Sequence, residues 1–293
     1  MNPLLWQLVW HFANGTSFFV GAMILLIAVM LSSLKKNKWR NLLIYPLVLV
    51  ATVEILLSAT PLSLWFYILW GIATIAWLIA CGRPSIPQRV RFYSQIAVVI
   101  LCCIAMAIEL PYHLAPHIPK GEHKTLYVIG DSVSAGIGGI KEAPWPMLLG
   151  KEHNVNVINL AIAGATATSA IKQAKQVQDP NAIVLIEIGG NDMLTPTPTK
   201  DFETSLEQIL TLVTSPTRTI IMLEFPLLPL QNEYGKIQRS LAKKHGVVLI
   251  PKRFFVDVLS SPNATVDLAH LSQSGHKLMA DNIWAIVNPA IKP

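Results

Sequence analysis

Long apolar stretches fill the first 110 residues of the chain and restrict what that part can fold into. Four can be distinguished, at about residues 17–34, 42–59, 62–81 and 93–110. Each approaches the roughly 20 residues that an α-helix needs to cross a bilayer core about 30 Å thick. The sequence therefore predicts a transmembrane anchor region of about four spans over residues 1–110, a linker at 111–123 and a folded domain at 124–293.

Charged residues are divided unevenly between the two parts. Residues 1–119 contain seven of the 23 Lys and Arg residues and two of the 17 Asp and Glu residues, which leaves 16 basic and 15 acidic residues for 120–293. Nearly all of the net charge of +6 thus belongs to the apolar part. This distribution argues against a nucleic-acid partner, because such a partner requires a basic face on the folded domain.

The orientation of the predicted spans follows from the seven basic residues, which all lie in two short loops at 35–40 and 82–91. The positive-inside rule places both loops in the cytoplasm. A cleaved signal peptide is not favoured, because no basic residue opens the chain and the apolar character continues to residue 110. We therefore expect a multi-pass protein of the bacterial inner (cytoplasmic) membrane, with the folded domain facing the periplasm or the outside.

Glu54 falls in the middle of the second apolar stretch, where a charge is costly. It is either a site for a proton or a polar ligand, or a protonated or hydrogen-bonded packing residue. We favour packing, because no second charge lies nearby in the apolar sequence to form a relay. The linker histidines at 113, 117 and 123 have no acidic or cysteine partners in the sequence. No zinc-type spacing of cysteines occurs either, and we expect neither a metal nor an organic cofactor.

From residue 124 onward, β-rich runs alternate with helix-like stretches, which predicts an α/β domain with a parallel sheet covered on both faces. The predicted strands are Thr125–Ile129, Val155–Ile162, Ala182–Ile188, Thr219–Glu224 and Val247–Ile250. The predicted helices are Ala143–Glu152, Ala167–Gln176, Phe202–Val213, Tyr234–His245 and about Ser274–Ile286. Sites in open parallel sheets form beyond the carboxyl ends of the strands, so the residues that follow each strand are the first candidates for chemistry.

Four short blocks fall at such positions: Gly-Asp-Ser-Val-Ser-Ala-Gly at 130–136, Asn-Leu-Ala-Ile-Ala-Gly at 159–164, Gly-Gly-Asn-Asp at 189–192 and Asp-Leu-Ala-His at 267–270. Acyl transfer by a serine needs an imidazole to take its proton and a carboxylate to orient that imidazole. Ser132, His270 and Asp267 can fill these three roles.

The developing oxyanion needs hydrogen-bond donors that are already aimed at it. The backbone N–H groups of Ser132 and Gly164 and the side-chain amide of Asn191 are candidates. Each block taken alone is typical of a turn or a capped helix start. Their combination, in this order and at the ends of predicted elements, favours an esterase site.

The combination closely resembles the SGNH hydrolase superfamily of GDSL-type esterases and lipases, over about residues 124–288. The resemblance implies a flavodoxin-like, three-layer α/β domain with a parallel sheet. It implies that Ser132 is both nucleophile and oxyanion donor, that Gly164 and Asn191 are the other donors, and that Asp267 and His270 complete the triad. In this family the reaction needs no cofactor and no metal.

Two details concern one branch of that superfamily. The segment 129–136 is particularly similar to the thioesterase/lysophospholipase branch, and 224–229 resembles the loop after the fourth strand. Ala165 departs from that branch, which often has Asp at this position. We expect the departure to alter substrate contacts and to leave the chemistry intact.

Other residues near the blocks have competing interpretations. Asp131 is expected to support the turn at Ser132 and not to act as the triad acid. Asp192 either holds the Asn191 loop by hydrogen bonds or is simply solvated. His276 is expected on the helix that follows His270. Ser134 is the nearest rival nucleophile.

These observations predict a membrane-anchored serine ester hydrolase that cleaves acyl esters of lipids or of O-acylated envelope glycans. Its expected partners are that acyl-ester substrate and the lipid bilayer, and the sequence does not show whether it has a protein partner. Two alternatives stay open. One is an envelope O-acyltransferase that uses the same triad, although four spans are few to transport an acyl donor. The other is a catalytically retired, ligand-binding domain.

Overall fold

The computed structural model describes residues 3–34, 38–139, 142–195, 197–267 and 269–292, which form two compact units. The helical unit comprises His11–Pro111 and Leu228–Asn232. The α/β unit comprises Met1–Trp10, Tyr112–Leu227 and Glu233–Pro293.

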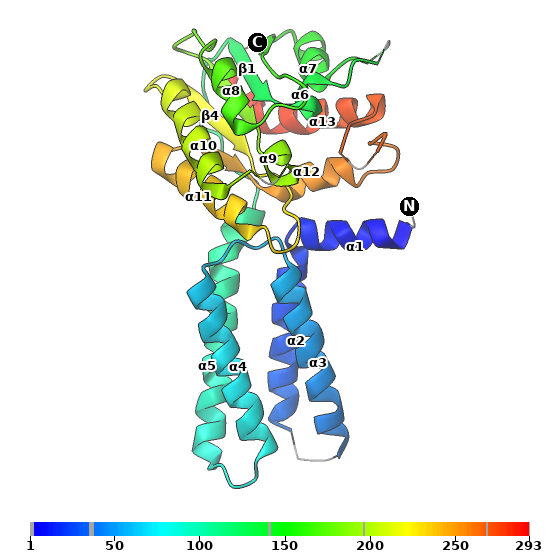
Figure 1. Ribbon diagram of the computed structural model, residues 1–293, viewed down its shortest axis with the longest axis vertical. Helices are drawn as coiled ribbons and strands as arrows, with labels where there is room; N and C mark the ends of the chain where they lie inside the picture. The colour runs from blue at the N-terminus through cyan, green and yellow to red at the C-terminus, as the bar shows by residue number, and fades with distance from the viewer. Residues whose placement is uncertain (1–2, 35–37, 140–141, 196, 268, 293) are drawn as a thin grey trace. The chain divides into compact units, whose positions relative to one another are not determined.

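The helical unit is built from α2 (Thr16–Ser32), α3 (Lys38–Leu57), α4 (Leu64–Gly82) and α5 (Gln88–Glu109), which fall on the four apolar stretches (Figure 1). In the chain, α1 (Pro3–Ala13) precedes these helices and a short 3₁₀ turn, η1 (Leu110–His113), follows α5; only the end of α1 and the start of η1 belong to the helical unit. Several large apolar side chains of α4 are exposed, including Ile68, Ile72 and Ile75. A helix that is apolar on its outer face as well as its inner face is typical of a membrane span.

Two helices in the described ranges are long and apolar enough to cross a membrane, Leu64–Gly82 and Gln88–His113. A third candidate arises if Gln7–Ala13 and Thr16–Ser32, which are bent by 83° at their junction, form one broken span. The apolar helix Leu42–Leu57 is shorter than the others, and α3 contains Pro46. Four spans therefore remain a prediction.

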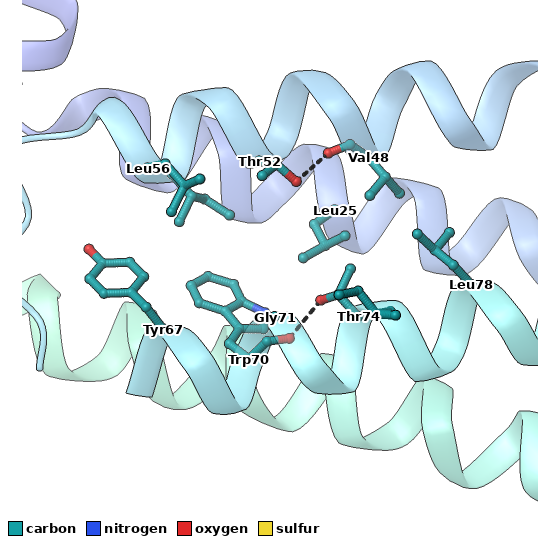
Figure 2. Close-up of a pocket in the computed structure, with 11 residues that line it drawn as sticks. Leu25, Val48, Thr52, Leu56, Tyr67, Trp70, Gly71, Thr74 and Leu78 are labelled. Carbon is teal, nitrogen blue, oxygen red and sulfur yellow. Dashed lines mark hydrogen bonds between the residues drawn. The ribbon is translucent and has the colours of Figure 1, made fainter. Parts of the chain in front are cut away.

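Within the helical unit, α2 packs on α3, α4 packs on α5, and α2 also contacts α5. A cavity of about 210 Å³ lies between α2, α3 and α4 and is lined mostly by apolar side chains such as Leu25 and Trp70 (Figure 2). The hydroxyls of Thr52 and Thr74 in its wall donate to the carbonyls of Val48 and Trp70 on their own helices. Both hydroxyls therefore already have a hydrogen-bond partner and need no polar ligand in the cavity.

Glu54 has a partner that the sequence did not indicate. Its Oε2 lies 2.7 Å from Nε2 of His11, a residue 43 positions earlier in the chain. A side chain at Gly21 of α2 would come within 2.8 Å of the Glu54 Cβ, so α2 and α3 pack closely at this level. This hydrogen bond favours the packing role for Glu54.

The α/β unit contains five parallel strands in the order β2-β1-β3-β4-β5, which is the strand order of the flavodoxin-like class that the resemblance implied. The strands are β1 (Thr125–Gly130), β2 (Asn156–Asn159), β3 (Ile183–Glu187), β4 (Thr219–Leu223) and β5 (Val248–Ile250). Every residue of β1 and of β3 is buried. Such burial is expected for central strands that are covered on both faces.

Helices cover both faces of this sheet (Figure 1). One group consists of α7 (Trp145–His153), α12 (Lys252–Leu259) and α13 (Gln273–Val287), in which α13 contacts the other two. On the other side, α8 (Ala167–Ala174) packs on α10 (Thr199–Val213). The remaining helices are α6 (Ser132–Ala135), α9 (Gly190–Leu194) and α11 (Asn232–His245). None of the helices α6, α9 and α12 was predicted from the sequence.

The end of the predicted linker is integrated into the α/β unit. His123 forms a parallel bridge with Ile291 near the C-terminus. The His123 ring bonds to the Asn181 carbonyl at 3.3 Å and to the Thr219 hydroxyl at 2.9 Å. His123 thus connects the segment before β1 to the residues at which β3 and β4 begin.

Candidate active site

The first block forms a tight turn between β1 and α6. Asp131 caps α6, because its Oδ1 accepts a hydrogen bond of 3.0 Å from the backbone N–H of Val133. Ser132 is the first residue of this helix and is partly exposed. The turn therefore presents the Ser132 side chain beyond the carboxyl end of β1, where the sheet topology places a site.

Ser134 is fully buried. Its hydroxyl donates to Glu187 Oε2 at 2.9 Å and accepts from the indole N–H of Trp145 at 3.2 Å. Both hydrogen-bonding functions of this hydroxyl are therefore occupied in the core. Ser134 is poorly suited to be a nucleophile, and Ser132 is the serine of this block that a substrate can reach.

The second block runs beside the end of β1. The backbone N–H groups of Leu160 and Ile162 donate to the carbonyls of Val128 and Gly130, at 2.8 and 3.1 Å. Gly164 follows in a turn with a φ of +75°, a conformation that L side chains rarely adopt. Apart from its two chain neighbours, no described residue has an atom within 4 Å of where a side chain of Gly164 would begin, so the surroundings of this backbone are open.

Asn191, on α9, connects the third block to the first two. Its Nδ2 donates to Asp131 Oδ2 and to the Ala165 carbonyl, both at 3.0 Å. Two acceptors in these positions require the NH₂ end of the amide to face them, which fixes the orientation of the side chain. The structure thus brings Asp131, Asn191 and the residue after Gly164 together.

Asp192 is fully buried and not solvated. Its Oδ2 accepts a hydrogen bond of 2.8 Å from the backbone N–H of Ala167, at the start of α8. Burial raises the pKa of Asp192, and this bond partly offsets the effect. Asp192 therefore holds α9, and with it Asn191, against the first turn of α8.

The fourth block positions a histidine on a carboxylate. Asp267 Oδ2 lies 2.7 Å from His270 Nδ1, and Asp267 Oδ1 accepts from the backbone N–H groups of Ala269 and His270, both at 2.8 Å. Burial acts to raise the pKa of Asp267, but these hydrogen bonds outweigh it and lower the pKa to about 2. An ionised carboxylate only accepts hydrogen bonds, so Nδ1 carries the hydrogen and Nε2 of His270 is left as the basic nitrogen.

His270 also acts electrostatically on the turn that carries Ser132. Burial raises the pKa of Asp131 to about 6, while the N–H of Val133, the Glu187 carboxyl and the charge of His270 each lower it. The ring therefore lies within electrostatic range of the residue next to Ser132. None of the hydrogen bonds found in the described ranges joins Ser132 to His270, so that contact remains a prediction.

Two buried residues of this site were not anticipated. Gln173 of α8 bonds to both sides of Gly130, since its Oε1 accepts from the Gly130 N–H at 2.9 Å and its Nε2 donates to the Gly130 carbonyl at 3.0 Å. Glu187 accepts from Ser134 and from the backbone N–H of Asp131. An acidic residue at the end of a fully apolar strand, as at Glu187, was the available signal in the sequence.

His276 lies on α13, as expected, and is fully buried. Its Nδ1 accepts from the backbone N–H of Trp145 at 3.3 Å, and its Nε2 lies 3.0 Å from Glu142 Oε1. Both ring nitrogens are therefore occupied by structural bonds. Within the described part of the chain, no group of three or more His, Cys, Asp or Glu residues is arranged to hold a metal ion.

Sequence comparisons agree with this geometry. The model of the GDSL-like lipase/acylhydrolase family matches residues 128–278. An arylesterase of Vibrio mimicus is 33% identical over 158 residues, which cover 48% of this chain and 76% of the relative. The thioesterase 1/protease 1/lysophospholipase L1 of Escherichia coli K12 is 31% identical over 145 residues, 45% of this chain and 67% of the relative.

Solved structures show the same fold. A crystal structure of TesA superposes with a TM-score of 0.50 at 23% identity and covers 56% of this chain and 98% of its own. The psychrotrophic esterase EstA from Pseudoalteromonas superposes with a TM-score of 0.51 at 21% identity, over 56% of this chain and 97% of its own. The predicted SGNH fold is thus confirmed. The chain belongs to the GDSL-like lipase/acylhydrolase family and is a hydrolase of carboxylic esters.

Proposed function

We propose that the protein is a membrane-anchored serine esterase in which Ser132, His270 and Asp267 form the catalytic triad. The observation that carries this proposal is the Asp267–His270 hydrogen bond of 2.7 Å, which leaves Nε2 of His270 as a free base. The partly exposed Ser132 at the start of α6 supplies a hydroxyl for that base.

In the acylation step, Ser132 Oγ forms a bond to the ester carbonyl carbon while His270 Nε2 takes the hydroxyl proton. Collapse of the tetrahedral intermediate breaks the bond to the alcohol oxygen, and His270 returns the proton to that leaving group. Water then attacks the acyl-enzyme by the same route in reverse, which releases the acid and restores Ser132. Asp267 keeps the ring in one tautomer and stabilises the imidazolium.

The oxyanion is stabilised by the backbone N–H groups of Ser132 and Gly164 and by the amide of Asn191. Both hydrogens of that amide are directed to Asp131 and to the Ala165 carbonyl. Donation to substrate therefore requires one of these bonds to be shared or released as negative charge develops. A charge-assisted hydrogen bond to an oxyanion is stronger than the neutral bond to a carbonyl, so the exchange is favourable.

Exposed apolar side chains around the site support lipid-like acyl esters as substrates over O-acetylated glycans. Ile137, Ile162, Leu194 and Val266 are between 51% and 61% exposed. Ile137, Ile162 and Val266 lie in loops beside the four blocks, and Leu194 is the last residue of α9. An acyl chain laid across these residues would remove apolar surface from water, whereas an acetyl group is too short to reach several of them.

The membrane location belongs to the same proposal. Two helices that could be membrane spans and the apolar outer surface of α4 support an anchor. The positive loops at 35–40 and 82–91 support a cytoplasmic location for those loops and an outward location for the α/β unit. A bilayer next to the active unit would supply lipid esters at high local concentration.

The nucleophile is tested by comparing two serine variants of the full-length protein in detergent. Ser132→Ala should abolish hydrolysis of p-nitrophenyl esters and labelling by a fluorophosphonate, because no acyl-enzyme can form. Ser134→Ala is the matched control, and it should retain labelling with reduced turnover because it loses only buried hydrogen bonds. Labelling that survives in Ser132→Ala and disappears in Ser134→Ala would reverse the assignment.

The oxyanion role of Asn191 is tested by Asn191→Ala. Loss of one donor should lower kcat by about 10²–10³ with little change in KM, because the donor acts on the transition state. Asn288→Ala serves as the control, since its amide only bonds to carbonyls near the end of α13 and its loss should leave kcat unchanged. Wild-type kcat in a folded Asn191→Ala protein would contradict the role.

The acyl-chain preference is tested with uncharged substitutions at two of these exposed apolar residues. Ile162→Ser and Leu194→Ser should each lower kcat/KM for decanoyl esters by up to about tenfold and leave acetyl esters nearly unchanged, because only the long chain loses apolar contact. Met147, which is 60% exposed on α7, provides the control variant Met147→Ser. Equal losses on both esters would argue against chain binding at these residues.

The predicted topology is tested with alkaline phosphatase fusions in a bacterial host. A fusion after residue 86 should be inactive, because the loop at 82–91 is predicted to be cytoplasmic. A fusion after residue 293 should be active, because the α/β unit is predicted to face outward. The opposite pattern would place the esterase in the cytoplasm.

A further inference from the structure

The carboxyl group of Glu187 lies under the turn that carries Ser132, and the mechanism above gives it no step. Its Oε2 accepts from the Ser134 hydroxyl at 2.9 Å and from the backbone N–H of Asp131 at 3.3 Å. These two residues flank Ser132 on either side. Glu187 therefore holds both ends of the nucleophile turn to the end of β3.

The surroundings of Glu187 favour a neutral carboxyl group. Burial raises the pKa of Glu187 well above its ordinary value, and the negative charge of Asp131 raises it further. The two carboxyl groups also share a hydrogen bond, which lowers the pKa of Asp131 and raises that of Glu187. Both effects favour the proton on Glu187, whereas the anionic form of Asp131 is stabilised by the N–H of Val133 and by the charge of His270.

Charged groups on other elements act on this pair through Asp131. Asp192 of α9 raises the pKa of Asp131, and His270, from the segment before α13, lowers it. From α7 the neighbouring side chain is the neutral indole of Trp145, which bonds to Ser134, and from α8 it is the neutral amide of Gln173. Asp131 is thus the charged group that is affected directly when Glu187 loses its proton.

The proton on Glu187 can affect Asn191, the proposed oxyanion donor, through Asp131. The two oxygens of Asp131 accept from Val133 N–H and from Asn191 Nδ2, each at 3.0 Å, and its backbone N–H donates to Glu187 Oε2 at 3.3 Å. An acceptor that is held in place keeps the NH₂ end of Asn191 in place. A change at Glu187 would therefore reach both Asn191 and the Ser132 turn without any contact with substrate.

We propose that Glu187 is a positioning residue that works as a neutral hydrogen-bond donor: its O–H holds the Asp131 carboxylate, which aims the Asn191 amide and fixes the Ser132 turn. This inference rests on the proposed function of Ser132 and Asn191. Loss of the proton at high pH would place two anions side by side in a buried site. Their repulsion would displace Asp131, so the proton on Glu187 sets the alkaline limit of activity.

The test uses the full-length protein in detergent and measures kcat and KM for one ester across pH. Glu187→Gln keeps the size of the side chain and a hydrogen-bond donor but cannot ionise. Its kcat near neutral pH should therefore be retained. The fall in kcat at high pH, the alkaline limb of the profile, should move to higher pH or vanish. Glu187→Leu removes the donor and should lower kcat at pH 7.5 by about 10–100-fold with KM nearly unchanged, less than the loss of an oxyanion donor itself.

Glu142→Gln is the matched control. Glu142 lies near the same turn but bonds to His276 and to the backbone at Ile137 and Gly139, not to Asp131. Its variant should keep the wild-type alkaline limb. If the role of Glu187 is purely structural, Glu187→Gln will be less stable than the wild type but will have the same alkaline limb. That result would overturn the proposal.

A second measurement needs only wild-type protein. Infrared spectra with ¹³C-labelled glutamate should show the carbonyl band of a protonated glutamic acid at pH 7.5, and this band should disappear in step with the alkaline limb. A band that is absent at pH 7.5 would overturn the proposal even if Glu187→Gln does not fold. Hydrolysis that survives in Ser132→Ala would refute the proposed function instead, and the infrared result would be unaffected.

Discussion

The parallel register between β1 and β3 places Gly130 opposite Glu187, and the candidate site depends on this pairing. It brings the buried acid of one strand under the turn that leaves the other. A side chain at Gly130 would come within 2.9 Å of both Glu187 Oε2 and the Ser134 hydroxyl, so the turn can close only over a glycine. The position of Asp131 between the Glu187 carboxyl and the amide of Asn191 follows from this arrangement.

Three aspartates of the site illustrate how the environment assigns roles to one residue type. Asp267 is stabilised as an anion by backbone donors and the His270 ring, and its pKa falls to about 2. Burial raises the pKa of Asp131 to about 6, although the N–H of Val133 and the Glu187 carboxyl act to lower it. Asp192 is buried against the start of α8, and its pKa is also raised. Only Asp267 combines a robust negative charge with a bond to a histidine, as a triad acid requires.

Apolar runs in the sequence predicted the five strands and the parallel sheet, because such runs are local signals, and the family resemblance carried by the four blocks implied the flavodoxin-like fold class. The sequence did not predict α6 or α9, since helices of four or five residues carry no periodicity. It placed the end of the second strand at Ile162, whereas β2 ends at Asn159 and the chain continues beside β1 through backbone bonds. The sequence also could not reveal the hydrogen-bond partners of Glu54 and Glu187, because both depend on contacts between residues more than 40 positions apart.

The two histidines near the C-terminus show why proximity in sequence does not decide which one is the base. Nδ1 of His276 accepts from a backbone N–H, so its Nε2 carries the hydrogen and donates to Glu142. Nδ1 of His270 donates to Asp267, which leaves Nε2 with a lone pair and without a structural bond in the described ranges. His276 is fully buried, whereas the His270 side chain is 34% exposed. A general base needs a free nitrogen that a substrate or a serine can approach, and of the two only His270 provides it.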